Sequence, residues 1–221
     1  MAAAARRAGR DPAAVRLVGA AKKQPVERVA AALRAGLRDL GENYVQEAVA
    51  MRDALRAQEP ALAREITWHG IGHLQTNKAR DAAACFDWLH GVDSARLAQG
   101  LAKHAAAAQR TLVVLLQVNL SGEATKSGVS EAELPALLDA VRALPALRAA
   151  GLMTMPAPSP DPEAARPVFA KLRTLCDRLG LEELSMGMSD DFEVAVEEGA
   201  TLVRIGTALF GERGSAQGDA T

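Results

Sequence analysis

A lysine follows a short apolar run directly, at Lys22 in LVGAAKKQP (17–25). If the run is a strand, the amine lies at its tip and is partly withdrawn from water, a setting in which lysine attacks aldehydes to form a Schiff base. The plain alternative for Lys22, as for its neighbour Lys23, is a solvated lysine in a strand–helix loop. The pattern makes Lys22 a candidate for covalent carbonyl chemistry.

A second candidate site lies near the end of the chain, in VRIGTALFG (203–211). Gly206 lets the backbone approach a ligand closely, and Thr207 opens a short helix whose amides could hold an anion. Ser189, in LSMGMSDD (184–191), could add a hydroxyl. The alternative for Ser189 is a helix N-cap whose following aspartates complement the helix dipole. These residues predict a phosphate site.

Arg204 lies inside an apolar strand, and an inward guanidinium needs a partner. That partner is either a ligand ring or a core carboxylate such as Glu42. Four methionines lie at two strand ends, where they pack the core or contact a flat ring; they are Met153, Met155, Met186 and Met188.

Several classes of function find no support in the composition. The 26 basic and 27 acidic residues give a net charge of -1, too small to attract nucleic acid or an anionic membrane. Cys85 and Cys176 are far apart and His69 and His73 do not form a helical HExxH pair, so the sequence predicts reduced thiols and no metal site. No segment approaches the roughly 20 apolar residues of a membrane span. We expect a cytoplasmic protein.

The elements that must position these residues alternate along the chain. Short apolar runs separate longer helical patterns, which predicts strand–helix units on a parallel sheet. The expected strands are 16–21, 39–41, 67–71, 88–91, 111–119, 147–153, 183–186 and 202–205. Eight units favour a closed (β/α)8 TIM barrel, with a doubly wound open sheet as the alternative. In such a barrel the candidate residues share the mouth at the carboxyl ends of the strands.

Four ordered motifs carry a family resemblance: GENYVQEA (41–48), WHGIGHLQTNK (68–78), GLMTMPA (151–157) and LSMGMSDDFEVAVEEGATLVRIGTALFG (184–211). Together they resemble the pyridoxal 5'-phosphate (PLP) homeostasis protein family. The resemblance implies a PLP-binding barrel of fold type III, like the alanine racemase N-terminal domain but without a second domain. It places that barrel at residues 1–211 and leaves 212–221 as a disordered tail.

The resemblance also implies roles for single residues. Lys22 would form the Schiff base, because Pro25 sets the spacing that selects it over Lys23 although the family's usual SKTKP is AAKKQP here. The other expected cofactor contacts are Asn43 and Arg204 at the ring, Met186 and Met188 as pocket walls, and Ser189, Gly206 and Thr207 at the phosphate. Family members begin earlier than this chain, so a shorter first helix is expected. Lys126 matches a lysine near the family's barrel mouth, and its role stays open.

The function implied by the resemblance is PLP homeostasis: buffering and delivery of the cofactor, with PLP-dependent apoenzymes as partners and no substrate turnover. The alternative is a PLP-dependent amino-acid racemase, which needs an acid–base group on each face of its substrate. Tyr44 is the chain's one tyrosine, and no second domain is expected to supply another. A third possibility is a PLP-independent barrel enzyme for a phosphorylated metabolite. Without the dimer-forming domain we expect a monomer.

Overall fold

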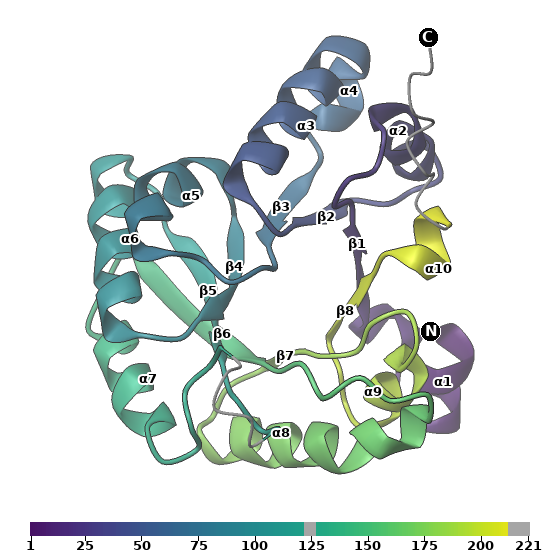
Figure 1. The fold of residues 1–221 in the computed structure, drawn as a ribbon, viewed down its shortest axis with the longest axis vertical. Coiled ribbons are helices and arrows are strands. Elements are labelled where there is room, and N and C mark those ends of the chain that lie inside the picture. The colour runs from purple at the N-terminus through teal and green to yellow at the C-terminus, as the bar shows by residue number, and fades with distance from the viewer. Residues whose placement is uncertain (122–126, 212–221) are drawn as a thin grey trace, which may run out of the picture.

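The computed structural model describes residues 1–121 and 127–211. In this part of the chain eight parallel strands close into one barrel in sequence order, with β1 paired to both β2 and β8. Helices lie around the strands (Figure 1). The predicted (β/α)8 barrel is confirmed, and the open sheet is excluded because β8 returns to β1. The expected tail at 212–221 and Lys126 lie outside the described residues.

All the predicted strands form, with ends that differ from expectation by at most two residues. The strands are β1 Arg16–Ala20, β2 Asp39–Glu42, β3 Thr67–Gly70, β4 Trp88–Val92, β5 Leu112–Gln117, β6 Leu147–Met153, β7 Glu183–Ser185 and β8 Leu202–Ile205. The α-helices are α1 Ala2–Arg7, α2 Val26–Arg34, α3 Val45–Gln58, α4 Pro60–Ala63, α5 Ala79–Cys85, α6 Ala95–Ala107, α7 Leu134–Arg142, α8 Arg166–Arg178, α9 Phe192–Glu197 and α10 Thr207–Phe210. Short 3-10 helices occupy Pro12–Ala14, Thr76–Lys78 and Pro162–Ala165.

Local capping signals explain two of the helix starts. Asp161 accepts a hydrogen bond from the backbone of Glu163 at the start of the turn that leads into α8. Before α7, the Ser130 amide donates to the Glu133 carboxylate and the Glu133 amide donates to the Ser130 hydroxyl, which is a reciprocal capping box. Both are short-range signals: an aspartate directly before a proline, and a serine three residues before a glutamate.

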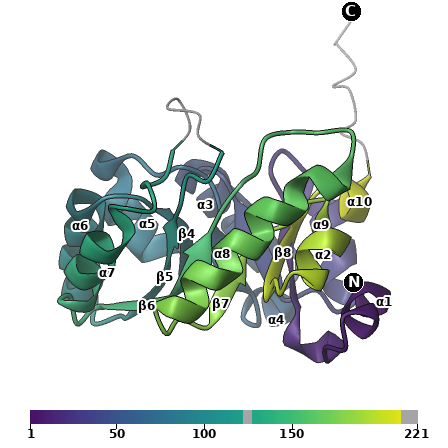
Figure 2. The same ribbon diagram turned by 90° about the horizontal axis from the view of Figure 1, so that it is seen from below.

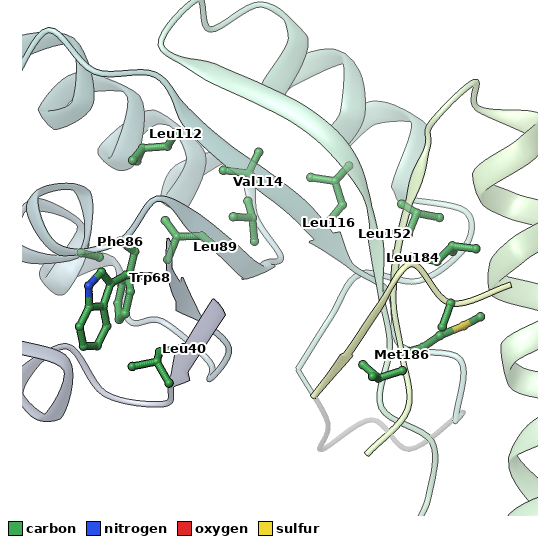
Figure 3. Close-up of a cluster of buried hydrophobic side chains, with 14 of the residues drawn as sticks. Leu40, Trp68, Phe86, Leu89, Leu112, Val114, Leu116, Leu152, Leu184 and Met186 are labelled. Atoms are coloured by element: carbon green, nitrogen blue, oxygen red, sulfur yellow. The ribbon is translucent and has the colours of Figure 1, made fainter. Parts of the chain in front are cut away.

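The main hydrophobic core lies between the barrel and its helices. Leu112, Val114 and Leu116, every second residue of β5, are fully buried in this layer (Figure 3). Because side chains alternate along a strand, the intervening residues face the barrel interior. There a smaller apolar cluster is formed by Val18, Ile71, Trp88, Leu115, Ala150, Met153 and Leu202.

The two ends of the barrel differ in what they carry. Strands enter at the end near α1 and leave toward the end near α10 (Figure 2). The carboxyl ends of the strands and the loops that follow them therefore form one mouth, as in other barrels of this class. No helix in residues 1–121 and 127–211 is long and apolar enough to span a lipid bilayer.

Candidate functional site

A cavity of about 440 Å³ opens at the barrel mouth. Its lining comes from the ends of β1, β2, β3 and β8 and from the loops after β6 and β7. The lining residues are Ala20, Lys22, Gln24, Asn43, Ile71, Gly72, His73, Met155, Met188, Ser189, Asp190, Arg204, Gly206 and Thr207. Every site residue expected from the sequence is in this set except Met186.

The two adjacent lysines face different places. Lys22 is half-buried and lines the mouth cavity, whereas Lys23 is exposed, has a left-handed φ of 57°, and lines a separate hollow beside α3. The Lys22 Nζ lies 5.7 Å from the centre of the Tyr44 ring, which is a cation–π distance. Of the two amines, only that of Lys22 can meet a ligand in the mouth cavity.

The loop after β2 forms the wall next to Lys22. Asn43 is half-buried at the cavity, and its backbone passes so close to Gly72 that a Cβ there would lie 2.5 Å from the Asn43 oxygen. Gly72 therefore allows two strand-end loops to pack together, which fixes the position of Asn43. His73, next to Gly72, pairs with Asp93 through its Nδ1 at 3.3 Å.

The expected phosphate residues lie together on the wall formed by the ends of β7 and β8, on the other side of β1 from Asn43. Gly206 caps the short helix α10, Thr207 begins it, and the Ser189 hydroxyl accepts a hydrogen bond from the Ala208 amide at 3.2 Å. This contact joins the loop after β7 to the start of α10. Ser189 is not the N-cap of α9 as the alternative held, because Asp191 occupies that position.

Arg204 forms part of the cavity floor and is 4 % exposed. Its guanidinium donates to the Ser185 hydroxyl at 2.5 Å and to the Thr154 carbonyl at 3.2 Å. Burial lowers the pKa of Arg204 to about 10, with Asp191 acting in the opposite direction, so the group stays cationic at neutral pH. The expected alternative partner, Glu42, is not bonded to it in the described structure.

Met186 is a correction to the expected cavity wall. It is fully buried in the layer between barrel and helices, beside Leu184 (Figure 3), and does not line the cavity. Strand alternation gives the reason: Ser185 faces the interior, so Leu184 and Met186 face outward. Met155 and Met188, each about 40 % exposed, are the methionines at the cavity.

Sequence reasoning missed a line of buried polar side chains below the cavity. His69 and His90 are both completely buried inside the barrel, where they bond to each other at 2.9 Å. His90 also bonds to Ser185, and His69 to Asp39. The signal available in the sequence was a polar residue at an inward-facing position of β3, β4 and β7. In the described residues no group of three or more potential ligands could hold a metal ion.

The donor set of the cavity suits an anionic, planar aldehyde. It offers a primary amine after β1, hydroxyls and a helix start after β7 and β8, and a buried cation at the floor to which no carboxylate of the described residues is bonded. An amine bonds covalently to a carbonyl carbon, and a helix start with hydroxyls binds phosphate oxygens. The residues present therefore fit pyridoxal phosphate.

Comparison with known proteins agrees with this geometry. The family model for the alanine racemase N-terminal domain matches residues 2–214. A pyridoxal phosphate homeostasis protein of Pseudomonas aeruginosa is 51% identical over 95% of this chain and 90% of its own length. The protein of the same name from Escherichia coli is 44% identical, over 96% of this chain and 91% of its own length.

Solved structures give the same result. PipY of Synechococcus elongatus, determined with PLP bound, superposes with a TM-score of 0.83 at 38% identity and covers 95% of this chain and 98% of its own. Alanine racemase of Corynebacterium glutamicum shares the fold at 21% identity, with a TM-score of 0.68. The match covers 97% of this chain and 60% of the racemase.

Proposed function

Because the chain belongs to the pyridoxal phosphate homeostasis protein family, we propose that it holds PLP at the barrel mouth and buffers or delivers it. Lys22 carries the cofactor as a Schiff base, and no substrate is turned over. The observation that carries the proposal is the shared cavity: Lys22, Arg204 and the Ser189–Thr207 wall all line it.

Each wall has its own task in this proposal. When bound, PLP supplies an aldehyde that condenses reversibly with an amine and releases water, which suits storage and handover. Lys22 provides that amine. Ser189, Gly206 and Thr207 hold the phosphate, and Asn43 and Met188 contact the ring. Arg204 faces the pyridine nitrogen, where a fixed cation disfavours ring protonation and so weakens the electron sink that amino-acid chemistry requires.

The direct test is to trap the cofactor on its lysine. The purified protein is mixed with PLP, reduced with borohydride, digested and mapped. The modified residue should be Lys22, and Lys22→Ala should abolish the imine absorbance. Lys23→Ala is the matched control, since that side chain points away from the cavity, and it should keep a normal spectrum. Labelling of Lys23 in wild type, or a normal imine in Lys22→Ala, would overturn the assignment.

A racemase-like side activity is the second candidate, favoured by one contact. The Tyr44 ring lies beside the Lys22 amine at 5.7 Å, so two groups that can carry a proton share the mouth. Exchange of the α-proton of alanine in deuterated water measures this activity. Exchange that is lost in Lys22→Ala and in Tyr44→Phe would support this activity. Exchange no faster than with free PLP would rule it out and leave only the carrier role.

We also infer the setting in which the protein works. It acts as a monomer in the cytoplasm, where its buried, unpaired thiols stay reduced, and it hands PLP to PLP-dependent apoenzymes. Light scattering after size exclusion tests the monomer. Transfer is tested by the rate at which an apoenzyme gains activity when PLP arrives on this protein, compared with free PLP.

A further inference from the structure

One continuous line of hydrogen bonds crosses the barrel interior beneath the cavity. Arg204 bonds to the Ser185 hydroxyl at 2.5 Å, Ser185 to His90 Nδ1 at 2.7 Å, His90 Nε2 to His69 Nδ1 at 2.9 Å, and His69 Nε2 to Asp39 at 2.8 Å. Arg204 is at the mouth, and Asp39 begins β2 at the other end of the barrel. Four of the five side chains are at most 4 % exposed.

The Asp39 end of this line fixes the direction of every bond in it, because both imidazoles are buried and neutral and a neutral ring has one donor nitrogen and one acceptor nitrogen. Arginine can only donate, and an ionised carboxylate can only accept. His69 Nε2–H therefore donates to Asp39, His90 Nε2–H donates to His69 Nδ1, and the Ser185 hydroxyl donates to His90 Nδ1. Arg204 donates to the Ser185 oxygen. Both imidazoles are neutral and carry their proton on Nε2. Burial lowers the pKa of both rings, most strongly for His90, which agrees with the neutral forms.

We propose that Ser185, His90 and His69 are positioning residues for Arg204, which together hold its guanidinium on the cavity floor in the orientation that faces the cofactor ring. This inference rests on the proposed function. The dipoles of Ser185, His90 and His69 are aligned, because each of these side chains turns its acceptor atom toward Arg204 and its N–H or O–H donor toward Asp39. The negative ends of these dipoles therefore favour the cation at the mouth. The guanidinium thus stays fixed without a directly bonded carboxylate that would neutralise it.

Packing holds the end of this line of hydrogen bonds that lies farthest from the cavity. The His69 ring stacks on Trp88 with 5.6 Å between ring centres, and the Arg16 guanidinium lies over the Trp88 ring at 4.3 Å from its centre. Arg16 in turn pairs with Glu183 at the start of β7. The His69 ring therefore cannot turn without disturbing the strand ends at the bottom of the barrel.

Two isosteric variants of His90 separate positioning from simple stability. His90→Asn keeps an amide acceptor near the Nδ1 position, toward Ser185, and loses the link to His69. His90→Gln reaches the Nε2 position, toward His69, and loses the acceptor for Ser185. We expect Ser185→Ala and His90→Gln to weaken PLP binding about tenfold or more, the value of one hydrogen bond to a charged group, and His90→Asn to weaken it clearly less.

Gln117→Leu is the control for general damage to the barrel, since Gln117 is buried at the end of β5 but is not part of this line of hydrogen bonds. It should lower the melting temperature without a tenfold loss of PLP affinity. If both His90 variants lose PLP affinity equally, and the loss follows the drop in melting temperature, then this line of hydrogen bonds is only structural.

A measurement without cofactor tests this line of hydrogen bonds independently of the proposed function. Long-range proton–nitrogen NMR correlations of wild-type protein at neutral pH report which ring nitrogen carries the proton. We expect His69 and His90 both to show a protonated Nε2 and a bare Nδ1. A proton on Nδ1 of either ring would overturn the proposal even if PLP binds, while failure to bind PLP with the expected tautomers would count against the function alone.

Discussion

Among single residues, Glu42 has the most unusual environment. It ends β2, is 1 % exposed, and its Oε2 has no hydrogen-bond partner in the described structure. Burial and, to a smaller extent, the nearby Glu47 raise the pKa of Glu42 to about 8, against the opposing effect of Lys22. A carboxyl group at this position is neutral at the pH where most carboxylates are charged.

This shift predicts a pH-dependent stability with a definite sign. The pKa of Glu42 is about 8 in the folded protein against an ordinary 4.5, so the folded state binds more protons between these values. The contribution of Glu42 to the free energy of unfolding is fully present below pH 4.5 and is lost as the pH rises to about 8. The loss is at most about 1.4 kcal/mol per pH unit. Urea titrations at about pH 5 and about pH 8 measure it.

Glu42→Gln should remove this slope, because the amide has nearly the same shape and does not titrate. Glu27→Gln, at an exposed position of α2, is the matched control and should keep the wild-type slope. If wild type and Glu42→Gln lose stability in parallel as pH rises, then Glu42 is ionised in the folded protein and its assigned neutrality is wrong.

Residue types and spacing identified most of the cavity, but not its depth. Lys22, Ser189 and Arg204 follow or lie in recognisable strands, so their place at the mouth could be predicted. Met186 could not be placed correctly, because the face of a three-residue strand depends on where the strand begins. The partners of Arg204 could not be predicted either, since Ser185 and Thr154 lie 19 and 50 residues away from it and belong to other strand–helix units of the closed barrel.

At the scale of elements, one glycine controls the pairing of two strands. Gly151 in β6 lies opposite Glu183 in β7, and a Cβ on Gly151 would lie 1.8 Å from the Glu183 backbone oxygen. Gly151→Ala should force the strands apart and lower the free energy of unfolding by about 3 kcal/mol or more. Chemical denaturation measures the loss.

Gly180→Ala is the control for this substitution. Gly180 follows α8 with a φ of 64° and has nothing within 4 Å of an added Cβ, so alanine there meets only the left-handed backbone penalty of roughly 1–2 kcal/mol. Similar losses at the two positions would show that β6 and β7 can shift to accept the methyl group.

Strand positions were the easiest feature to predict. The expected strands at Leu147–Met153 and Leu202–Ile205 match β6 and β8 at both ends, because strands of a parallel barrel are mostly apolar even where one arginine interrupts them, as Arg148 and Arg204 do here. The hydroxyl of Ser189 was harder. Its bond to Ala208 joins two loops whose approach depends on the closure of the whole barrel.

For the whole molecule, barrel closure ties distant elements into one unit. Cys85 at the end of α5 and Cys176 in α8 are both about 2 % exposed or less, under the same core layer. Burial raises the pKa of Cys85, and burial with Asp177 and Glu183 raises the pKa of Cys176 to about 12. Neither thiol is therefore a reactive thiolate at neutral pH.

We therefore expect both thiols to resist a thiol reagent in the native protein and to become reactive together. In a closed barrel every strand is paired on both sides, so exposing either helix requires breaking the ring, and the two rates should coincide with global unfolding. Cys85→Ala and Cys176→Ala each leave one reporter, which lets the rates be measured separately in increasing urea. Earlier reaction at one cysteine would show that its side of the barrel opens first, and that closure does not make the molecule a single cooperative unit.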